Sequence, residues 1–287
     1  MTSILDSAIS SLIYLAVAFI LFFVGKMAYQ LFHRNINVNH ELVEHDNFAF
    51  SVAYVGYFIG LLLSIGSAIL GESNGLWIDL MDIAVYGVLA ILLLNFSIII
   101  NDKIILNTFH VKTEIIEQKN VGTGVVEGAM AVSTGLIILG AIHGEGFGAG
   151  GPIVTALLYW ILGQVILLIT AKVYNLITPY DVHEHIEKGN IAVGIGFAGA
   201  LIAIANLIRF ALMHDFESWE ITLQSVAVDV GIGLLFLPIV RLLADKILLP
   251  GKNLTDLIVN QEHPNNGAAL VEAFAYIGGS VLITWVL

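Results

Sequence analysis

Apolar residues gather along the chain in eight runs, each long enough to cross a lipid bilayer as a helix. The segments between the runs are short and hold most of the charged residues. The pattern therefore predicts an all-α integral membrane protein with eight transmembrane helices in contact with the lipid bilayer. The runs cover residues 8–31, 49–71, 78–101, 121–143, 152–177, 190–213, 221–243 and 266–287.

The second half of the chain repeats the first. A shift of 143 residues aligns Asn47 with Asn190, and a shift of 145 residues aligns Glu127 with Glu272. This predicts a four-helix repeat over residues 1–144, a glycine-rich external linker over 145–151 and a second four-helix repeat over 152–287. Because four helices return a chain to its starting side, we expect both repeats to share one orientation, related by a pseudo-two-fold axis along the membrane normal.

Basic residues indicate which side of the membrane is cytoplasmic, because Lys and Arg are retained there. Arg209 lies at the opposite side from the other ten basic residues, and so both termini are predicted to lie outside the cytoplasm. The ten residues are Lys26, Arg34, Lys103, Lys112, Lys119, Lys172, Lys188, Arg241, Lys246 and Lys252.

Composition agrees with the membrane prediction and excludes several other classes of protein. Hydrophobic residues make up 58% of the 287 residues, charged residues 12%, and the mean hydropathy is +0.91. The absence of cysteine excludes disulfides and thiolate metal ligands. A net charge of −12 does not suggest a nucleic-acid partner.

Glu127 and Glu272 are the polar residues most in need of explanation. Each lies about two turns into its apolar run, roughly 8 to 10 Å below the predicted cytoplasmic surface at 1.5 Å per residue. A carboxylate at that depth costs a few kcal/mol unless it is protonated, paired or hydrated. Two interpretations stay open: a twinned proton or cation site near the pseudo-axis, or a pair of protonated side chains that each donate a hydrogen bond between helices.

Four further polar residues are candidates for the same ion site. Asn47 and Asn190 begin the second and sixth runs, where they could either cap those helices or complete a ring with the glutamates. Asp82 and Asp229 lie toward the external side and suggest the outer part of a polar route.

Small residues predict close contacts between helices. They form one stripe through Gly56 and Gly60, with a counterpart at Gly199, and another through Gly124 and Gly128. Because small-residue faces exceed what one pair of four-helix repeats needs, we expect a homo-oligomer, most simply a dimer.

No residue pattern supports an enzyme, a metal site or a cofactor. The tract His183-Glu184-His185 has imidazole and carboxylate groups close in sequence, but a solvated surface helix is its ordinary explanation. No nucleophile with its base and no nucleotide-binding motif is present. We therefore predict a protein without catalytic activity, metal or cofactor.

The paired motif Asp46-Asn47-x-Ala49 with Gly56-x-x-x-Gly60, and its second copy Gly189-Asn190-x-Ala192 with Gly199, resembles an uncharacterised bacterial family called domain of unknown function 350. The second copy departs from the first where Gly189 replaces Asp46 and Ala203 replaces Gly60. The resemblance implies an inner (plasma) membrane protein. Longer members of the family similarly carry two tandem copies. It implies no catalytic residues, and a loose association of such families with envelope stress favours a scaffold.

Two functions remain in view. One is a transporter or channel for protons or another small cation, using the intramembrane carboxylates. The other is a non-catalytic membrane scaffold that recruits a cytoplasmic protein through the loops Asn101–Asn120 and Pro250–Asn265. These loops contain short amphipathic patterns typical of helices that lie on a membrane surface.

Overall fold

Helices account for nearly all of the computed structural model, which describes residues 2–70, 73–143, 151–214, 216, 218–243, 245–246, 251 and 253–287, with side chains from residue 8 onward except at residue 237. Most of the predicted linker 145–151 lies outside the described residues. The long helices are α1 (Thr2–Phe32), α2 (Phe48–Ile69), α3 (Leu76–Ile104), α4 (Val121–His143), α5 (Pro152–Ile177), α7 (Ile191–Leu212), α8 (Trp219–Leu243) and α10 (Asn266–Val286). Shorter segments are the π-helical turns η1 (His40–Glu44) and η2 (Thr113–Glu117) and the helices α6 (Val182–Glu187) and α9 (Leu254–Ile258).

The predicted membrane spans are confirmed. Among the described residues, eight helices are long and apolar enough to cross a membrane, and they match the eight predicted runs to within a few residues at most ends. Large apolar side chains stand exposed along them, including Phe19, Leu62 and Trp285. Because such side chains are stable only in an apolar solvent, the spans contact lipid directly.

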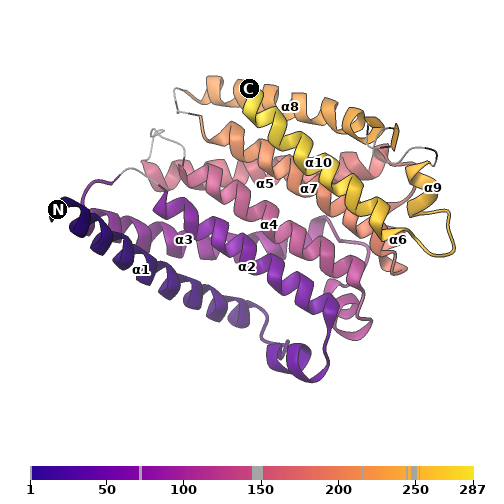
Figure 1. Cartoon of the computed structure of the whole chain (residues 1–287), viewed down its shortest axis with the longest axis horizontal. Coiled ribbons are helices and arrows are strands. Elements are labelled where there is room, and N and C mark those ends of the chain that lie inside the picture. Colours follow the sequence, from indigo (N-terminus) through magenta and orange to yellow (C-terminus); the bar gives the residue numbers. More distant parts are fainter. Residues whose placement is uncertain are drawn as a thin grey trace.

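Four of the spans form a row at the centre of the molecule, in the order α2, α4, α7 and α10 (Figure 1). Small residues bring neighbouring backbones together. A Cβ added to Gly124 of α4 would overlap the Ala49 carbonyl of α2, and one added to Gly135 would lie 2.5 Å from the Gly60 carbonyl oxygen. The contacts advance along both helices in the same direction, and so the helices of the row are parallel. We call the end at which they begin the cap end.

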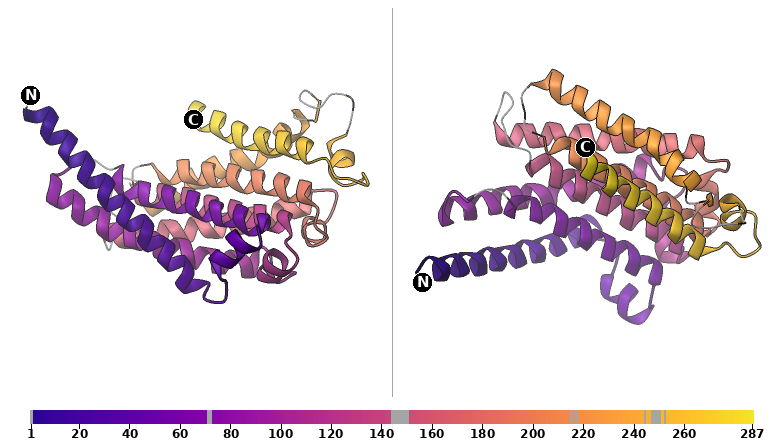
Figure 2. Two further views of the ribbon diagram at one scale, coloured as in Figure 1. Left: turned by 60° about the horizontal axis from the view of Figure 1, so that its bottom comes forward. Right: turned by 45° about the horizontal axis from the view of Figure 1, so that its top comes forward.

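The other four spans pack against this row. α3 contacts α2 and α4, α5 contacts α4 and α7, and α8 contacts α7 and α10. α1 packs against α3 and α2. These helices run in the opposite direction to the row. Because α1 begins and α10 ends opposite the cap end, both chain termini lie toward that end of the molecule (Figure 2).

The predicted pseudo-two-fold axis is wrong, because one contact recurs from helix to helix along the row. Gly124 of α4 packs on the Ala49 carbonyl of α2, and Gly194 of α7 packs in the same way on the Gly122 carbonyl of α4. A two-fold axis between the repeats would exchange α2 with α7 and α4 with α10. It would therefore turn the contact between α4 and α7 into a second contact between α10 and α2, whereas α2 and α10 occupy opposite ends of the row. The repeats are therefore related by a step along the row, with both copies in the same orientation.

The glycine stripe on which the dimer prediction rested is occupied within the chain. Gly56 packs against Gly128, Gly60 packs against Ala131, and Gly199 packs against Ala273. The Gly56 and Gly60 stripe therefore offers no surface to a second copy, and a homo-oligomer would need a different surface.

Large side chains end the row on both sides. Ala198 and Ala205 continue the α7 face that meets α4, and the residues 143 positions earlier on α2 are Val55 and Leu62, which are 56% and 63% exposed. At the other end, Gly140 of α4 corresponds to Trp285 of α10, which is 77% exposed. The inner faces of the row suit a close helix contact, whereas the outer faces suit lipid.

Candidate functional site

An asparagine begins each of the four helices of the row. In each case its Oδ1 accepts a hydrogen bond from the backbone N–H three residues later, at 3.1 Å for Asn47, 3.2 Å for Asn120, 3.1 Å for Asn190 and 3.0 Å for Asn265. This satisfies one of the free N–H groups at a helix start. The capping interpretation of Asn47 and Asn190 is thus confirmed, and neither side chain joins a ring with the glutamates.

The same asparagines link each helix of the row to the next. The Nδ2 of Asn47 donates to the Ile115 carbonyl at 3.0 Å, that of Asn120 to the Ile186 carbonyl at 2.7 Å, and that of Asn190 to the Ile258 carbonyl at 3.0 Å. Each acceptor lies in the short segment before the next helix of the row, namely η2, α6 and α9. We call this series of bonds the asparagine ladder, and it fixes the level at which all four helices begin.

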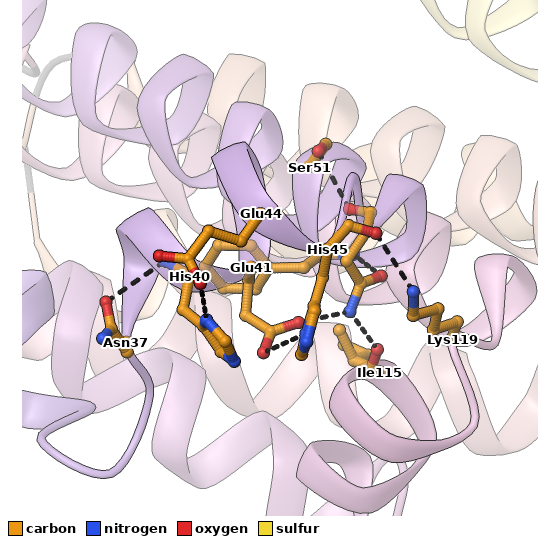
Figure 3. A network of polar contacts seen from close by, with 10 residues as sticks. Asn37, His40, Glu41, Glu44, His45, Ser51, Ile115 and Lys119 are labelled. Carbon is orange, nitrogen blue, oxygen red and sulfur yellow. Dashed lines mark hydrogen bonds and ion pairs between the residues drawn. The ribbon is translucent and has the colours of Figure 1, made fainter.

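Carboxylates support the first two steps of the ladder, one buried and one partly buried. Glu41 accepts from the Asn47 Nδ2 at 2.8 Å, and Glu114 accepts from the Asn120 Nδ2 at 2.8 Å. Around the first step, His45 lies 3.4 Å from Glu41, and Lys119 donates to the His45 carbonyl at 3.1 Å (Figure 3). The cluster of His and Glu side chains in η1 thus has a structural role at the ladder.

The sequence contains a signal for this ladder that the comparison of halves missed. The pattern Glu-x-x-Glu-x-x-Asn ends at Asn47, at Asn120 and at Asn190. The residue before each asparagine has a left-handed backbone, with φ of 45° at Asp46, 51° at Lys119 and 80° at Gly189. Each four-helix repeat is therefore itself built from two units, and each unit consists of a helix, a short turn and a helix of the row.

Replacing Asn120 by alanine should lower the free energy of unfolding by about 2 kcal/mol, because a helix cap and a buried bond to the next segment are lost together. Asn265 is the matched control, since it caps α10 but is exposed and ends the ladder. Its replacement should cost about 1 kcal/mol or less. Denaturant unfolding in detergent would measure both, and equal losses would contradict the ladder.

Glu127 faces a second carboxyl group, that of Asp102 on α3. The two side chains lie within hydrogen-bonding reach of each other. Glu127 Oε2 and Asp102 Oδ1 are buried and find no hydrogen-bond donor among the described residues. Seven residues separate Glu127 from its cap Asn120, which places the pair roughly 10 Å from the start of the helix. We call Asp102 and Glu127 the acid pair.

Three tyrosines of the first repeat form one aromatic cluster, and one of them interacts with the acid pair. The Tyr29 phenol of α1 lies within electrostatic range of both carboxyls, and its ring packs on those of Tyr54 and Tyr57 at 4.9 and 4.7 Å between centroids. Tyr57 donates to the Gly25 carbonyl at 2.7 Å and accepts from the Asn95 Nδ2 at 3.2 Å. The pair has polar neighbours, but none of the described ion pairs gives it a basic partner.

Glu272, the counterpart of Glu127, is held by a cation. Its side chain is fully buried, and its Oε1 lies 3.2 Å from the Arg241 Nε of α8. Tyr276 donates to the same oxygen at 3.3 Å. Tyr180 lies nearby, outside the spans, and burial together with the Glu272 carboxylate raises the pKa of its phenol to about 12. The phenol therefore stays protonated at neutral pH.

One substitution distinguishes the two sites. Asp102 aligns with Asp245, and Arg241, four residues before Asp245, aligns with Ile98. The first repeat thus has the acidic residues Asp102 and Glu127. The second repeat has their counterparts Asp245 and Glu272 together with the guanidinium of Arg241. The structure does not bring Glu127 and Glu272 together, since the partners of Glu127 come from α1 and α3 and those of Glu272 from α8 and α10.

The two aspartates predicted to lie toward the external side are apart from both glutamates. Asp82 is exposed on the surface of α3, and so it does not enter an internal polar route. Asp229 is buried in α8, 3.4 Å from the His214 Nε2. It precedes Arg241 by twelve residues, or about 18 Å along the helix. Neither aspartate thus pairs with the groups around Glu127 or Glu272 among the described contacts, and a polar route between them stays a prediction.

Comparisons with known proteins agree with the duplicated membrane architecture. A family model described as Domain of Unknown Function (DUF350) matches the chain twice, over residues 3–142 and 148–287. A UPF0719 transmembrane protein of Aquifex aeolicus (strain VF5) is 26% identical over 187 residues, which is 65% of this chain and 66% of the relative. The match thus covers just under two thirds of that relative's length. No solved structure matches the chain.

Proposed function

Because the chain belongs to the family described as Domain of Unknown Function (DUF350), a description that names no activity, we propose a function from the site itself. The protein is a non-catalytic, proton-linked transporter or channel whose working group is the acid pair Asp102 and Glu127. The observation that carries this proposal is a pair of facing, partly buried carboxyls without a basic partner among the described residues.

Electrostatics supports a cation at the acid pair. Two carboxylates that face each other in a buried site repel each other and lose hydration, so that the pair is stable only when it holds a proton or another cation. No group of three or more His, Asp or Glu side chains suited to a metal ion occurs among the described residues. A proton, which needs only the two facing oxygens, fits this donor set better than a divalent metal.

Access supports the same proposal. Asp102 lines a cleft of about 410 Å³ at the cap end, where α3 gives way to the loop that follows it. Glu127 lies directly behind it, within the membrane-spanning part of α4. A cation can thus reach the pair from the cap end through Asp102.

The second repeat has a structural role in this proposal. The Arg241 guanidinium already neutralises Glu272, so that the second carboxyl has no need of a mobile cation. Duplication followed by the gain of one arginine would leave one working site and one fixed ion pair in the same chain.

Localisation and topology form part of the proposal. The chain is a multi-pass membrane protein, and we place it in the bacterial inner (plasma) membrane with the cap end in the cytoplasm and both termini outside. The distribution of Lys and Arg supports this orientation.

The alternative is a non-catalytic scaffold or envelope-stress component that recruits a cytoplasmic protein. It is favoured by the separation of Glu127 from Glu272, whose partners among the described residues lie on different helices. Its original support is weaker, because the amphipathic segments of both loops are packed into the fold. Ile115 of η2 is 5% exposed and Ile258 of α9 is fully buried.

Proteoliposomes would test the transport proposal. Wild-type protein should carry protons, sodium or potassium down an imposed gradient faster than empty vesicles. Glu127→Gln and Asp102→Asn should each abolish this flux, because an amide keeps the size of the side chain but cannot release a proton. Size-exclusion profiles and unfolding curves would confirm that both variants fold. A wild-type protein without flux for any of these cations would end the transport proposal and favour the scaffold.

A further inference from the structure

Two clefts flank the loop that follows α3 at the cap end. The first, about 410 Å³, lies between the last turn of α3 and residues 106–112. The second, about 330 Å³, lies between the same loop and the end of α5. Asn107 and Thr108 line both clefts, and so the loop separates two adjoining sites.

Lysines without a protein counter-ion line both clefts. Lys103 and Lys112 lie in the first and Lys172 in the second, and all three are exposed. None of the three lies within 4 Å of a carboxylate among the described residues, whereas Lys188 at the same end pairs with Glu184.

The acidic residues of the clefts have other partners. In the first cleft, Asp102 stands against Lys103, Lys112 and His110, and its carboxyl also faces Glu127. In the second, the Asp181 Oδ1 accepts from the backbone N–H groups of His183 and Glu184 as the cap of α6. The lysines of both clefts, which have no carboxylate partner among the described residues, are therefore free to bind an anion.

Apolar surface beside the clefts identifies the kind of anion. Ile104 and Leu176 line the second cleft and are 37% and 82% exposed, and Ile177 beside them is 54% exposed. These residues lie at the ends of α3 and α5, where a membrane helix passes from hydrocarbon to headgroups. A molecule with a negative head and apolar chains satisfies both surfaces, as basic pockets between membrane helices do for lipid headgroups.

We propose that the two clefts bind the phosphate of anionic phospholipid headgroups, with Lys103 and Lys112 holding a phosphate in the first cleft and Lys172 holding one in the second. Asn107 and Thr108, at the loop between the clefts, supply neutral hydrogen-bond donors to either. The acyl chains lie along the exposed apolar residues at the ends of α3 and α5. The first cleft is also the route to the acid pair in the transport proposal, so a phosphate held by Lys103 and Lys112 would lie at the mouth of that route. The binding test below measures no flux, and its outcome therefore does not depend on the transport proposal.

Native mass spectrometry of the full chain in detergent would test the site, with phosphatidylglycerol and phosphatidylcholine of equal chain length as probes. Wild-type protein should retain phosphatidylglycerol in clear preference to phosphatidylcholine. Each of Lys103→Gln, Lys112→Gln and Lys172→Gln should weaken phosphatidylglycerol binding about fivefold, and the triple variant on the order of a hundredfold. These lysines are exposed and unpaired, so the variants should fold, which a thermal unfolding curve would verify.

Lys188→Gln is the matched control, since Lys188 is also an exposed lysine at the cap end but is paired with Glu184. It should leave lipid retention unchanged. Inorganic phosphate in excess should not displace the lipid, because it lacks the apolar contacts. Displacement by free phosphate would assign the clefts to a soluble anion and overturn the proposal. Equal retention of both lipids, or unchanged retention in the triple variant, would overturn it as well.

Discussion

Replacing Gly56 by alanine should destabilise the protein by about 3 kcal/mol, at the upper end of the range for overpacked cores. The added Cβ would overlap the backbone of Gly128 on α4, and a backbone cannot move aside as a flexible side chain does. This backbone contact would have to open, and α2 and α4 would separate. Denaturant unfolding in detergent, followed by tryptophan fluorescence, would measure the loss.

Gly66 provides the matched control in the same helix. A Cβ at this position meets no atom within 4 Å. Gly66→Ala should therefore be neutral or stabilise the protein by up to about 1 kcal/mol, because alanine loses less conformational freedom on folding than glycine. Equal destabilisation by the two substitutions would show that α2 and α4 do not approach as the structure describes.

Removal of the Arg241 side chain as Arg241→Met should cost about 3 to 5 kcal/mol, because it leaves the buried Glu272 carboxylate without its counter-ion. The cost comes from the unpaired charge and not from lost packing. The double variant Arg241→Met with Glu272→Gln should therefore recover most of the stability. Unfolding curves of the wild type, both single variants and the double variant would measure the coupling.

The exposed pair of Lys188 and Glu184 is the control for this cycle. Lys188→Met should leave stability within experimental error, since exposed ion pairs contribute little. A double variant no more stable than Arg241→Met alone would mean that the guanidinium stabilises the protein by packing. The distinction between the two repeats would then lose its basis.

The sequence predicted the spans well, because a run of apolar residues of bilayer length has few alternatives to a membrane helix. It also predicted the duplication and the helix-packing role of Gly56, Gly60, Gly124, Gly128 and Gly199. It did not predict which helix each glycine meets. A stripe of small residues fits a neighbour within the chain as well as a second copy, and only the arrangement of helices separates the two.

The symmetry was wrong for a related reason. Alignment of the halves shows that two units share a sequence pattern, and a two-fold axis and a step along a row both satisfy that pattern. The choice depends on α10, the counterpart of α4 in the second repeat. With a two-fold axis, the face of α10 that corresponds to the α7-facing side of α4 would meet α2. Trp285 and Leu62 face lipid at positions where the inner helices have Gly140 and Ala205, and these large side chains indicate that α10 and α2 do not meet. This can be inferred only when the neighbours of each helix are known.

The candidate site was predicted in part. The depth of Glu127 and Glu272 follows from their distance to Asn120 and Asn265, and the structure keeps it. Their partners do not follow from spacing, because the rotation of α3 decides whether Asp102 or a neighbouring residue faces Glu127. Arg241 was taken only as a marker of the cytoplasmic side, although its alignment with Ile98 was already visible as a difference between the two copies.

Cation flux in proteoliposomes would test most directly the claim that the first repeat holds the working site. The decisive comparison is between Glu127→Gln and the double variant Arg241→Met with Glu272→Gln, since each removes the buried glutamate of one repeat without leaving a charge unpaired. We predict that flux falls to the level of empty vesicles in Glu127→Gln and stays near the wild-type rate in the double variant. Equal loss in both, or wild-type flux in Glu127→Gln, would contradict the account.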